Sequence, residues 1–216
     1  MSKMACKYVC VTHLETNMKP LDREFYLRDT LTVAKELLGK YLVREMDGRY
    51  LVGRITETEA YIGAIDKACH AYGGKITPRT KTLYEQGGTS YVYLVYGMYH
   101  CMNVVTEPQG EAAAVLLRSV EFVKGYEEAS MLRYGKELEV LSKAQLKNFA
   151  NGPGKLCKAM GITREQNNRN LCGQNFFITD CIEGINNPTF ELGISPRIGI
   201  DYAQEAKDFP WRFFSI

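Results

Sequence analysis

The most unusual strand predicted in this chain reads Leu51-Val-Gly-Arg-Ile-Thr-Glu-Thr-Glu-Ala-Tyr61. Side chains alternate between the two faces of a strand, so Leu51, Ile55, Glu57 and Glu59 are expected on one face, which begins apolar and ends with two carboxylates. If Leu51 and Ile55 face the core, the glutamates line the continuation of that core or a pocket opening from it. There they would have a raised pKa or be held by partners, and they would be suited to activating a water molecule. A frayed strand end with solvated glutamates is the alternative.

The elements predicted around this strand give an α+β fold on an antiparallel sheet. Asp47-Gly48 is a hairpin turn signal between strands at 41–46 and 49–61. Asp29 and Thr30 are N-cap candidates for a helix that Gly39 ends. Further strands are predicted at 91–96, 99–105, 112–121, 176–179 and 197–200, and helices at 125–133, 144–149 and 154–160. This order does not alternate strand and helix, which argues against a parallel sheet.

Length and composition indicate a single globular domain. Of the 216 residues, 45% are hydrophobic and 24% are charged, which excludes collagen-like, coiled-coil and fully disordered classes. The domain is predicted over residues 24–216, after a loosely attached leader at residues 1–23 that shows little periodicity. No apolar run approaches the ~20 residues that a bilayer crossing needs, so no membrane partner is expected. The net charge of +2 is too small to indicate a nucleic-acid binder by charge alone.

The cysteines and histidines point to neither a disulfide framework nor a metal site. The seven cysteines are odd in number and form no Cys-x-x-Cys pair, and the three histidines lack metal-ligand spacing. We therefore expect reduced thiols in an intracellular protein that holds no metal ion.

Aromatic residues gather in two groups that are candidates for ligand binding. Tyr91-Val-Tyr-Leu-Val-Tyr-Gly-Met-Tyr99 has four tyrosines across a tight hairpin, with Tyr96 and Met98 near its tip. The hairpin is either an ordinary half-buried aromatic ribbon or an exposed tip that enters a stack of bases. Tyr61, His70 and Tyr93 form a second group suited to stacking a planar ligand.

Two turns carry basic residues that are candidate phosphate contacts. The turn at 73–81 holds Lys75, Thr77 and Arg79, and Asn151-Gly-Pro-Gly-Lys155 opens a predicted helix. Basic side chains and free backbone N–H groups can bind phosphates at such places, although many surface loops have the same composition. The Walker, Gly-x-Gly-x-x-Gly, His-Glu-x-x-His and Gly-x-Ser-x-Gly patterns are all absent.

Taken together, these segments resemble the alkyladenine (3-methyladenine) DNA glycosylase family from about Thr30 to Phe214. The resemblance rests on Gly53-Arg-Ile-Thr-Glu-Thr-Glu-Ala-Tyr61, Ala68-Cys-His70, Thr77-Pro-Arg79, Tyr91-Val-Tyr-Leu-Val-Tyr-Gly-Met-Tyr99, Met102-Asn103, Ala114-Val-Leu-Leu-Arg118, Asn151-Gly-Pro-Gly-Lys-Leu156 and Arg197-Ile-Gly-Ile200. No single piece would suffice, but eight in the same order are specific.

The resemblance implies a role for each matching position. Glu59 matches the water-activating glutamate, and Arg118 matches the arginine that helps to hold that water. The pocket for the flipped base is implied at Tyr61, Ala68, His70, Tyr93, Asn103, Ile198 and Gly199. Within it, Asn103 matches the asparagine that crowds the 2-amino group of normal guanine. Tyr96, with Met98 beside it, matches the hairpin tip that fills the gap left in the duplex. Phosphate contacts are expected from Lys75, Thr77, Arg79 and Lys155.

The resemblance also implies the fold, the partner and the reaction. It implies a curved, mostly antiparallel sheet with a protruding β-hairpin, surrounded by short helices. The expected enzyme is a monofunctional glycosylase of base excision repair, active as a monomer without a cofactor, on double-stranded DNA that contains alkylated or deaminated purines. It would act in the nucleus of a eukaryote or in the cytoplasm and nucleoid of a bacterium.

Two other functions stay open from the residues alone. Glu57 and Glu59 lie about 7 Å apart on a strand, which is within the ~6.5–9.5 Å range of inverting glycosidases, so a glycoside or nucleoside hydrolase is the second hypothesis. The third is a nucleic-acid binding module without catalysis, in which the tyrosines stack bases and Glu59 is incidental.

Overall fold

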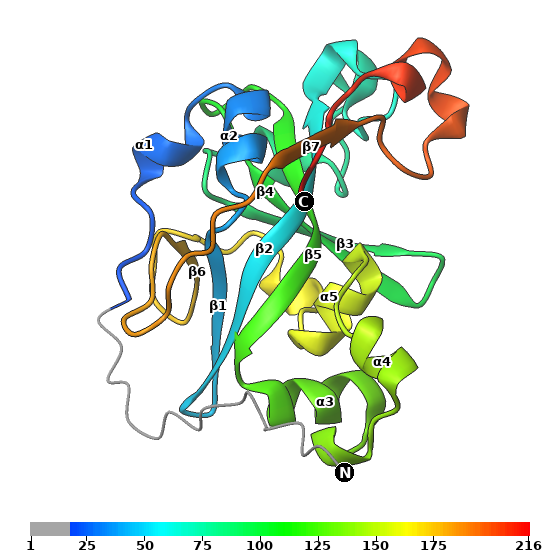
Figure 1. The fold of residues 1–216 in the computed structure, drawn as a ribbon. Coiled ribbons are helices and arrows are strands. Elements are labelled where there is room, and N and C mark those ends of the chain that lie inside the picture. The colour runs from blue at the N-terminus through cyan, green and yellow to red at the C-terminus, as the bar shows by residue number, and fades with distance from the viewer. Residues whose placement is uncertain (1–17) are drawn as a thin grey trace.

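The computed structural model describes residues 18–216, in which all strands pair antiparallel in one sheet (Figure 1). Residues 1–17, most of the predicted leader, lie outside the described residues. The strands are β1 (Tyr41–Met46), β2 (Arg49–Ile62), β3 (Ser90–Val95), β4 (Tyr99–Val105), β5 (Ala113–Lys124), β6 (Phe176–Thr179), β7 (Leu192–Ser195) and β8 (Arg212–Ser215). The α-helices are α1 (Arg23–Tyr26), α2 (Thr30–Glu36), α3 (Tyr126–Tyr134), α4 (Lys143–Lys147) and α5 (Pro153–Ala159). The predicted α+β class, with a curved sheet and short helices, is confirmed.

The long strand β2 organises the sheet. Its 14 residues exceed the usual ~5–6, so one edge has room for two successive partners. On that edge it pairs with β1 through Arg49–Arg54 and with β8 through Glu57–Glu59, while β5 follows its other edge. The strand order is β3-β4-β5-β2-β1-β6, with β8 and β7 added beside the second half of β2. The predicted strand 197–200 is wrong: β7 ends at Ser195, and after Pro196 the chain forms a loop. Proline cannot donate the next ladder hydrogen bond, and Gly199 has a φ of +75°.

Turn and cap residues act locally as the sequence predicts. Asp47 and Gly48 both have positive φ, as a type I′ hairpin turn requires. The Asp29 side chain accepts a hydrogen bond from the Thr32 N–H at 2.9 Å and so caps α2. Gly39 follows that helix with a φ of +82°.

A bulge in β2 reverses which face of the strand packs on the core. The pairing of β2 with β5 shifts on both sides of Glu57. Before the shift, Ile55 belongs to the main hydrophobic core; after it, Ala60 does, and the Thr58 hydroxyl donates to the Ala34 carbonyl of α2. Strict alternation is therefore broken, because a bulge adds a residue to one strand. As a result Glu57 and Glu59 lie on the face opposite Ile55, outside the main core, and Glu59 is buried beside residues that line a pocket, the second of its two predicted settings.

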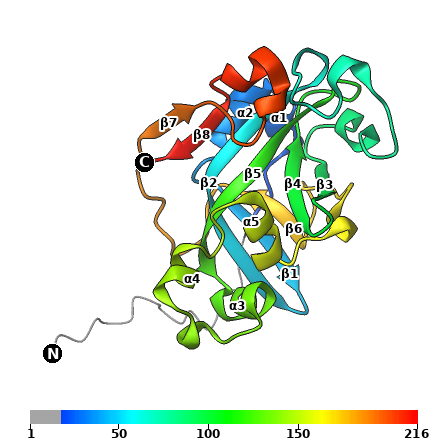
Figure 2. The ribbon, with the colours of Figure 1, turned by 90° about the vertical axis from the view of Figure 1, so that its right-hand side faces the viewer.

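The helices cover the core at both ends of the β2–β5 pair. In Figure 1, α1 and α2 lie toward its upper end and α3 to α5 toward its lower end, and Figure 2 gives the view from the side. Val33 of α2, Ala129 of α3 and Leu156 of α5 are fully buried in the same core cluster. Above this core, the 3-10 turns at 63–84 and the turn at 201–208 lie side by side around the second half of β2 (Figure 1). The hairpin β3–β4 projects beyond the body beneath them.

Candidate active site

Glu59 is a buried carboxylate with three donors around it. Its Oε1 accepts from the Ile198 N–H at 2.8 Å and lies 3.3 Å from Nη1 of Arg118, and its Oε2 accepts from the Tyr61 hydroxyl at 2.8 Å. The side chain is fully buried. Burial raises the pKa of Glu59 above its ordinary value, while Arg118 and the two hydrogen-bond donors favour the charged form. Such a group is a candidate general base.

A pocket of about 300 Å³ opens beside this carboxylate, and it collects most of the predicted site residues. Among its lining residues are Tyr61, Ala68, His70, Tyr93, Tyr96, Asn103, Arg118, Ile198 and Gly199. Glu59 lies directly behind Tyr61 and Ile198, both of which donate hydrogen bonds to it. The pocket draws on β2, β3, β4 and β5 and on the segments that follow β2 and β7, so residues far apart in the sequence meet here.

One wall of the pocket is aromatic, and the histidine in it is neutral. The rings of His70 and Tyr93 meet edge to face with centroids 4.6 Å apart. His70 Nδ1 lies 2.9 Å from the Tyr91 hydroxyl, and its Nε2 lies 3.2 Å from the guanidinium of Arg79. Because a guanidinium only donates, Nε2 is assigned as the acceptor and Nδ1 as the protonated nitrogen. Burial and the Arg79 charge lower the pKa of His70 to about 4, so the ring is neutral at pH 7.

Asn103 stands in the pocket floor and also braces the hairpin. It is 4% exposed, and its Nδ2 donates to the Tyr91 carbonyl at 3.1 Å. The two residues are directly paired between β3 and β4. The amide is therefore fixed in orientation by the strand opposite.

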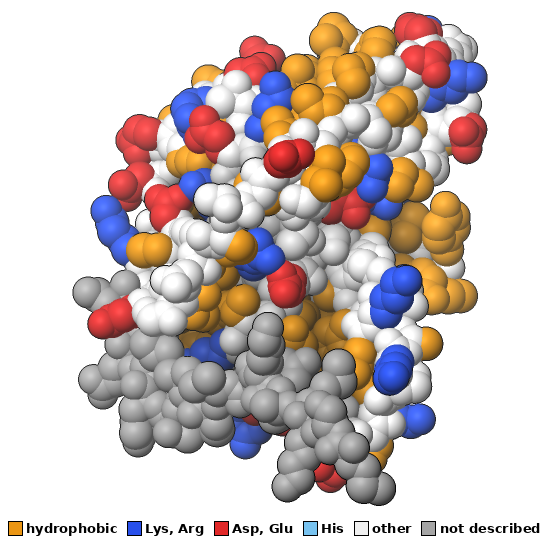
Figure 3. Space-filling model, in the orientation of Figure 1, with side chains coloured by type: hydrophobic (Ala, Val, Ile, Leu, Met, Phe, Trp, Pro, Cys, Tyr) orange, Lys and Arg blue, Asp and Glu red, His pale blue; other side chains and the backbone are white. Residues whose placement is uncertain are grey.

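The tip of the hairpin exposes apolar side chains. Tyr96 is 84% exposed and Met98 69%. Tyr96 and Gly97 both have positive φ, and the Met98 N–H donates to the Val95 carbonyl at 3.2 Å, which closes the turn. Positive φ is uncommon for a tyrosine, and such backbone conformations gather at functional sites. Figure 3 shows hydrophobic side chains grouped at the edge where the hairpin projects in Figure 1.

The predicted phosphate contacts occupy three different settings. Lys75 and Thr77 lie on the exposed loop outside the pocket lining. Arg79 lies at the aromatic wall, with its guanidinium 4.9 Å from the Tyr93 ring centroid. Lys155, near the start of α5, donates to the side-chain oxygens of Asn148 and Asn151, each at 3.0 Å.

Sequence reasoning missed a buried ion pair between Asp66 and Arg197. Both side chains are fully buried and are joined by two hydrogen bonds of 2.5 and 2.8 Å. The Arg197 guanidinium also donates to the carbonyls of Ala60 and Ala206 and lies over the Tyr61 ring, 4.6 Å from its centroid. It thereby ties the loop of Ile198, whose N–H reaches Glu59, to the segment after β2. Nothing in the spacing of residues 66 and 197 could have signalled the pair.

The described residues offer no metal cluster and no membrane span. Within residues 18–216, no three His, Cys, Asp or Glu side chains gather as a metal site would require. Over the same range, no helix has the length and apolar character to cross a bilayer. The groups present in the site are the Glu59 carboxylate, the Arg118 guanidinium and the aromatic pocket beside them; a buried carboxylate can accept a proton from water, and aromatic side chains can stack a planar group.

Comparison with known proteins agrees with this geometry. Residues 24–215 match the family model described as methylpurine-DNA glycosylase. Relatives that carry the name 3-methyladenine DNA glycosylase include one from Clostridium perfringens, 54% identical over 90% of this chain and 94% of the relative. Another, from Alkaliphilus oremlandii, is 55% identical over 90% of this chain and 94% of its own. A third, from Desulfitobacterium hafniense, is 48% identical over 91% of this chain and 95% of its own. The chain therefore belongs to the methylpurine-DNA glycosylase family, which makes it a DNA glycosylase of base excision repair and a hydrolase of N-glycosyl bonds.

Proposed function

We propose that this DNA glycosylase flips alkylated or deaminated purines out of duplex DNA and hydrolyses their N-glycosidic bond with a water activated by Glu59. The observation that supports this most is the buried Glu59 carboxylate, held by Arg118 and Ile198 behind an aromatic pocket. The names of the bacterial relatives support alkylated adenine as one substrate.

The chemistry of the lesion fits the residues of the pocket. Flipping a nucleotide costs a few kcal/mol, and a wedge such as Tyr96 replaces part of the lost stacking. A base alkylated at N3 or N7 is cationic, and the faces of Tyr61 and Tyr93 attract a cation by on the order of 0.5–2 kcal/mol. A cationic base is also a good leaving group. What remains is a water aimed at the sugar carbon, and Glu59 accepts its proton and stabilises the developing oxocarbenium charge.

The proposal includes the partner and the organisation of the chain. We expect a monomer in which residues 24–216 form one catalytic domain, with Lys75, Thr77, Arg79 and Lys155 near the phosphates of duplex DNA. We expect the reaction to take place inside the cell, in the compartment that contains the chromosomal DNA. We expect no cofactor, because an activated water suffices for hydrolysis.

The direct test is incubation of the protein with duplexes that each carry one lesion, followed by heat or alkali to break abasic sites. Strand breaks at alkylated or deaminated purines are the expected result. Binding without breaks would favour the nucleic-acid binding module, and cleavage of free nucleosides alone would favour the carboxylate-pair hydrolase. The carboxylate-pair hydrolase has less support, because Glu57 already accepts hydrogen bonds from Arg118 and Arg212.

Replacing Tyr96 by serine is expected to weaken excision from duplex DNA. The variant loses the ring that stacks in the gap, and stacking is worth ~1–3 kcal/mol per base. Single-turnover excision is measured on a lesion in a duplex and on the same lesion in a single strand, where no gap has to be filled. The loss should be confined to the duplex. Equal binding of lesion duplexes by variant and wild type would show that Tyr96 is not the wedge.

Replacing Asn103 by serine is expected to loosen selectivity against normal guanine. The shorter side chain removes the steric clash with the 2-amino group, so release of undamaged guanine rises while excision of alkyladenine falls little. Both activities are measured on one preparation together with the melting temperature. Since Asn103 also donates to the Tyr91 carbonyl, a uniform loss of activity with a lowered melting temperature would mean that its role is structural.

The excision rate is expected to fall on the acid side as Glu59 becomes protonated. Burial raises its pKa, so the midpoint should lie above the ~4.3 of an ordinary glutamate, with full activity at higher pH. His70, with a pKa of about 4, adds no change near pH 6.5. The profile is best recorded on an N7-alkylated guanine, because the base carries its positive charge throughout the acid range. A rate that stays level down to pH 4 would contradict Glu59 as the base.

A further inference from the structure

Glu57, the second carboxylate of β2, lies between two arginines. Its Oε1 accepts from Nε of Arg118 at 2.8 Å and from Nε of Arg212 at 2.5 Å. Its side chain is 16% exposed, and those of Arg118 and Arg212 are 12% and 21% exposed. Three charged side chains thus lie largely out of water next to the proposed base.

Arg118 in turn spans the two glutamates. Its Nε donates to Glu57, and its Nη1 lies 3.3 Å from Oε1 of Glu59. A guanidinium is planar and rigid, so fixing Nε also fixes the direction in which the two Nη groups point. Glu57 therefore sets the orientation of the guanidinium that faces Glu59.

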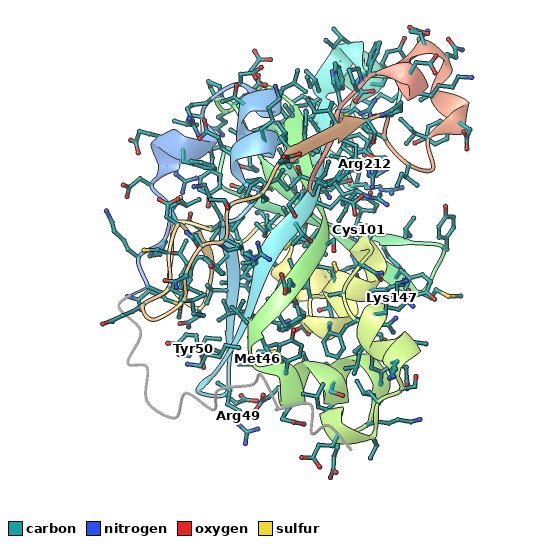
Figure 4. All side chains as sticks on the ribbon, viewed as in Figure 1. Met46, Arg49, Tyr50, Cys101, Lys147 and Arg212 are labelled. Carbon is teal, nitrogen blue, oxygen red and sulfur yellow. The ribbon has the colours of Figure 1, made fainter. Side chains whose placement is uncertain are left out.

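Arg212 is held by strands from the end of the chain. It lies on β8, opposite Glu59 of β2 on one side and Ser195 of β7 on the other. Its Nη1 donates to the Ser195 hydroxyl at 2.9 Å, and Figure 4 labels Arg212 close to the crossing of these strands. Ile198, whose N–H donates to Glu59, follows Ser195 in the same segment. These contacts close a ring from Glu59 through Arg118, Glu57 and Arg212 to Ser195, and then along the backbone to Ile198, whose N–H returns to Glu59.

We propose that Glu57 and Arg212 are positioning residues that hold Arg118, and through it Glu59, in the geometry for activating water. In this arrangement the terminal strand β8 is part of the active site. The inference rests on the proposed function, because it assigns to Glu57 and Arg212 a role in the reaction of Glu59.

The test is single-turnover excision from a duplex with one N7-alkylated guanine by Glu57→Gln, Arg212→Lys and Glu121→Gln. The first two should lower the rate constant by roughly 10²-fold, the scale of a misplaced catalytic group, with lesion affinity unchanged. Glu121→Gln is the matched control: Glu121 on β5 pairs with Arg54 of β2 outside the pocket, and its loss should leave rate and affinity unaltered.

The pH profile separates positioning from general weakening. The titratable and charged groups around Glu59 are Glu57 and Tyr61 on β2, Arg118 on β5 and Cys101 on β4. In Glu57→Gln the Arg118 guanidinium is no longer held against Glu59, and because Arg118 lowers the pKa of Glu59 more than Glu57 raises it, the acid limb should move to higher pH. A loss of rate caused by structural weakening alone would leave that limb in place.

Each outcome assigns a cause. If the wild-type protein releases no base from any lesion duplex, the proposed function fails, and this inference with it. If the wild type is active while Glu57→Gln keeps both its rate and its acid limb, the positioning role alone is overturned. A loss shared equally by Glu121→Gln also overturns it. If Glu57→Gln does not fold, Arg212→Lys is the test variant. Lysine keeps the positive charge but lacks the guanidinium that donates to both Ser195 and Glu57. An unchanged rate in Arg212→Lys contradicts the inference.

Discussion

Glu59→Gln is expected to lose excision while it still binds lesion duplexes. Glutamine has the same shape, its carbonyl oxygen can accept from the Ile198 N–H, and its NH2 group can donate to the Tyr61 hydroxyl oxygen, so the pocket should remain intact. It cannot accept the proton of the attacking water, and it offers no negative charge to the oxocarbenium-like transition state. Loss of a general base typically lowers the rate by about 10²–10⁴-fold.

The measurement is a single-turnover time course of base release, with lesion affinity determined separately by titration. Glu121→Gln supplies the control, since it removes the same charge from a surface pair. A variant at Glu59 that cleaves as fast as the wild type would remove this residue from the mechanism and return Glu57 to consideration as the base.

Asp66→Asn is expected to cause the largest loss of stability of any single change near the site. It leaves the Arg197 charge in a fully buried position without its counter-ion. Breaking a buried ion pair in this way costs about 3–5 kcal/mol. For a chain of this length, each kcal/mol lowers the melting temperature by ~2–4 °C, so a decrease of roughly 6–20 °C should be seen by calorimetry.

The chain offers a matched control in the surface pair Lys67–Glu205, which joins the same two segments of the chain. The two side chains are 26% and 62% exposed, and exposed pairs contribute at most about 1 kcal/mol. Glu205→Gln should therefore leave the melting temperature nearly unchanged. If Asp66→Asn melts no lower than this control, the buried pair does not hold the two segments together.

Local features of the fold could be predicted because they depend on neighbouring residues. The hairpin turn at Asp47-Gly48 and the cap at Asp29 follow from the φ angles and side-chain oxygens that those residues supply. Strand β1, at 41–46, has the boundaries predicted for it. The exposed position of Tyr96 follows in the same way, because Tyr96-Gly97 is the turn of the hairpin.

Two features could not be predicted from neighbouring residues: that residues 197–200 form a loop and not a strand, and which face of β2 packs on the core along its length. The pattern around Ile198 looks like a short strand, but the Arg197 side chain is drawn into the interior by Asp66 and by two backbone carbonyls. The alternation of Leu51 and Ile55 continues in the sequence to Glu57 and Glu59, whereas in the molecule the bulge reverses it. A bulge depends on how β5 pairs with β2, and the sequence of β2 does not contain that information.

The sequence by itself determined which chemical groups this protein has for catalysis and where its turns fall, since residue type and turn geometry are local properties. It also carried the family resemblance, through segments in a constant order. Only the tertiary structure decided which groups meet. Asp66 pairs with Arg197, 131 positions away in the sequence, and Glu57 pairs with Arg212, 155 positions away. The protonation state of Glu59 depends on its burial and on partners from other parts of the chain. Burial and electrostatic pairing depend on distance in space, and the chain brings these residues together only when the sheet has closed around β2.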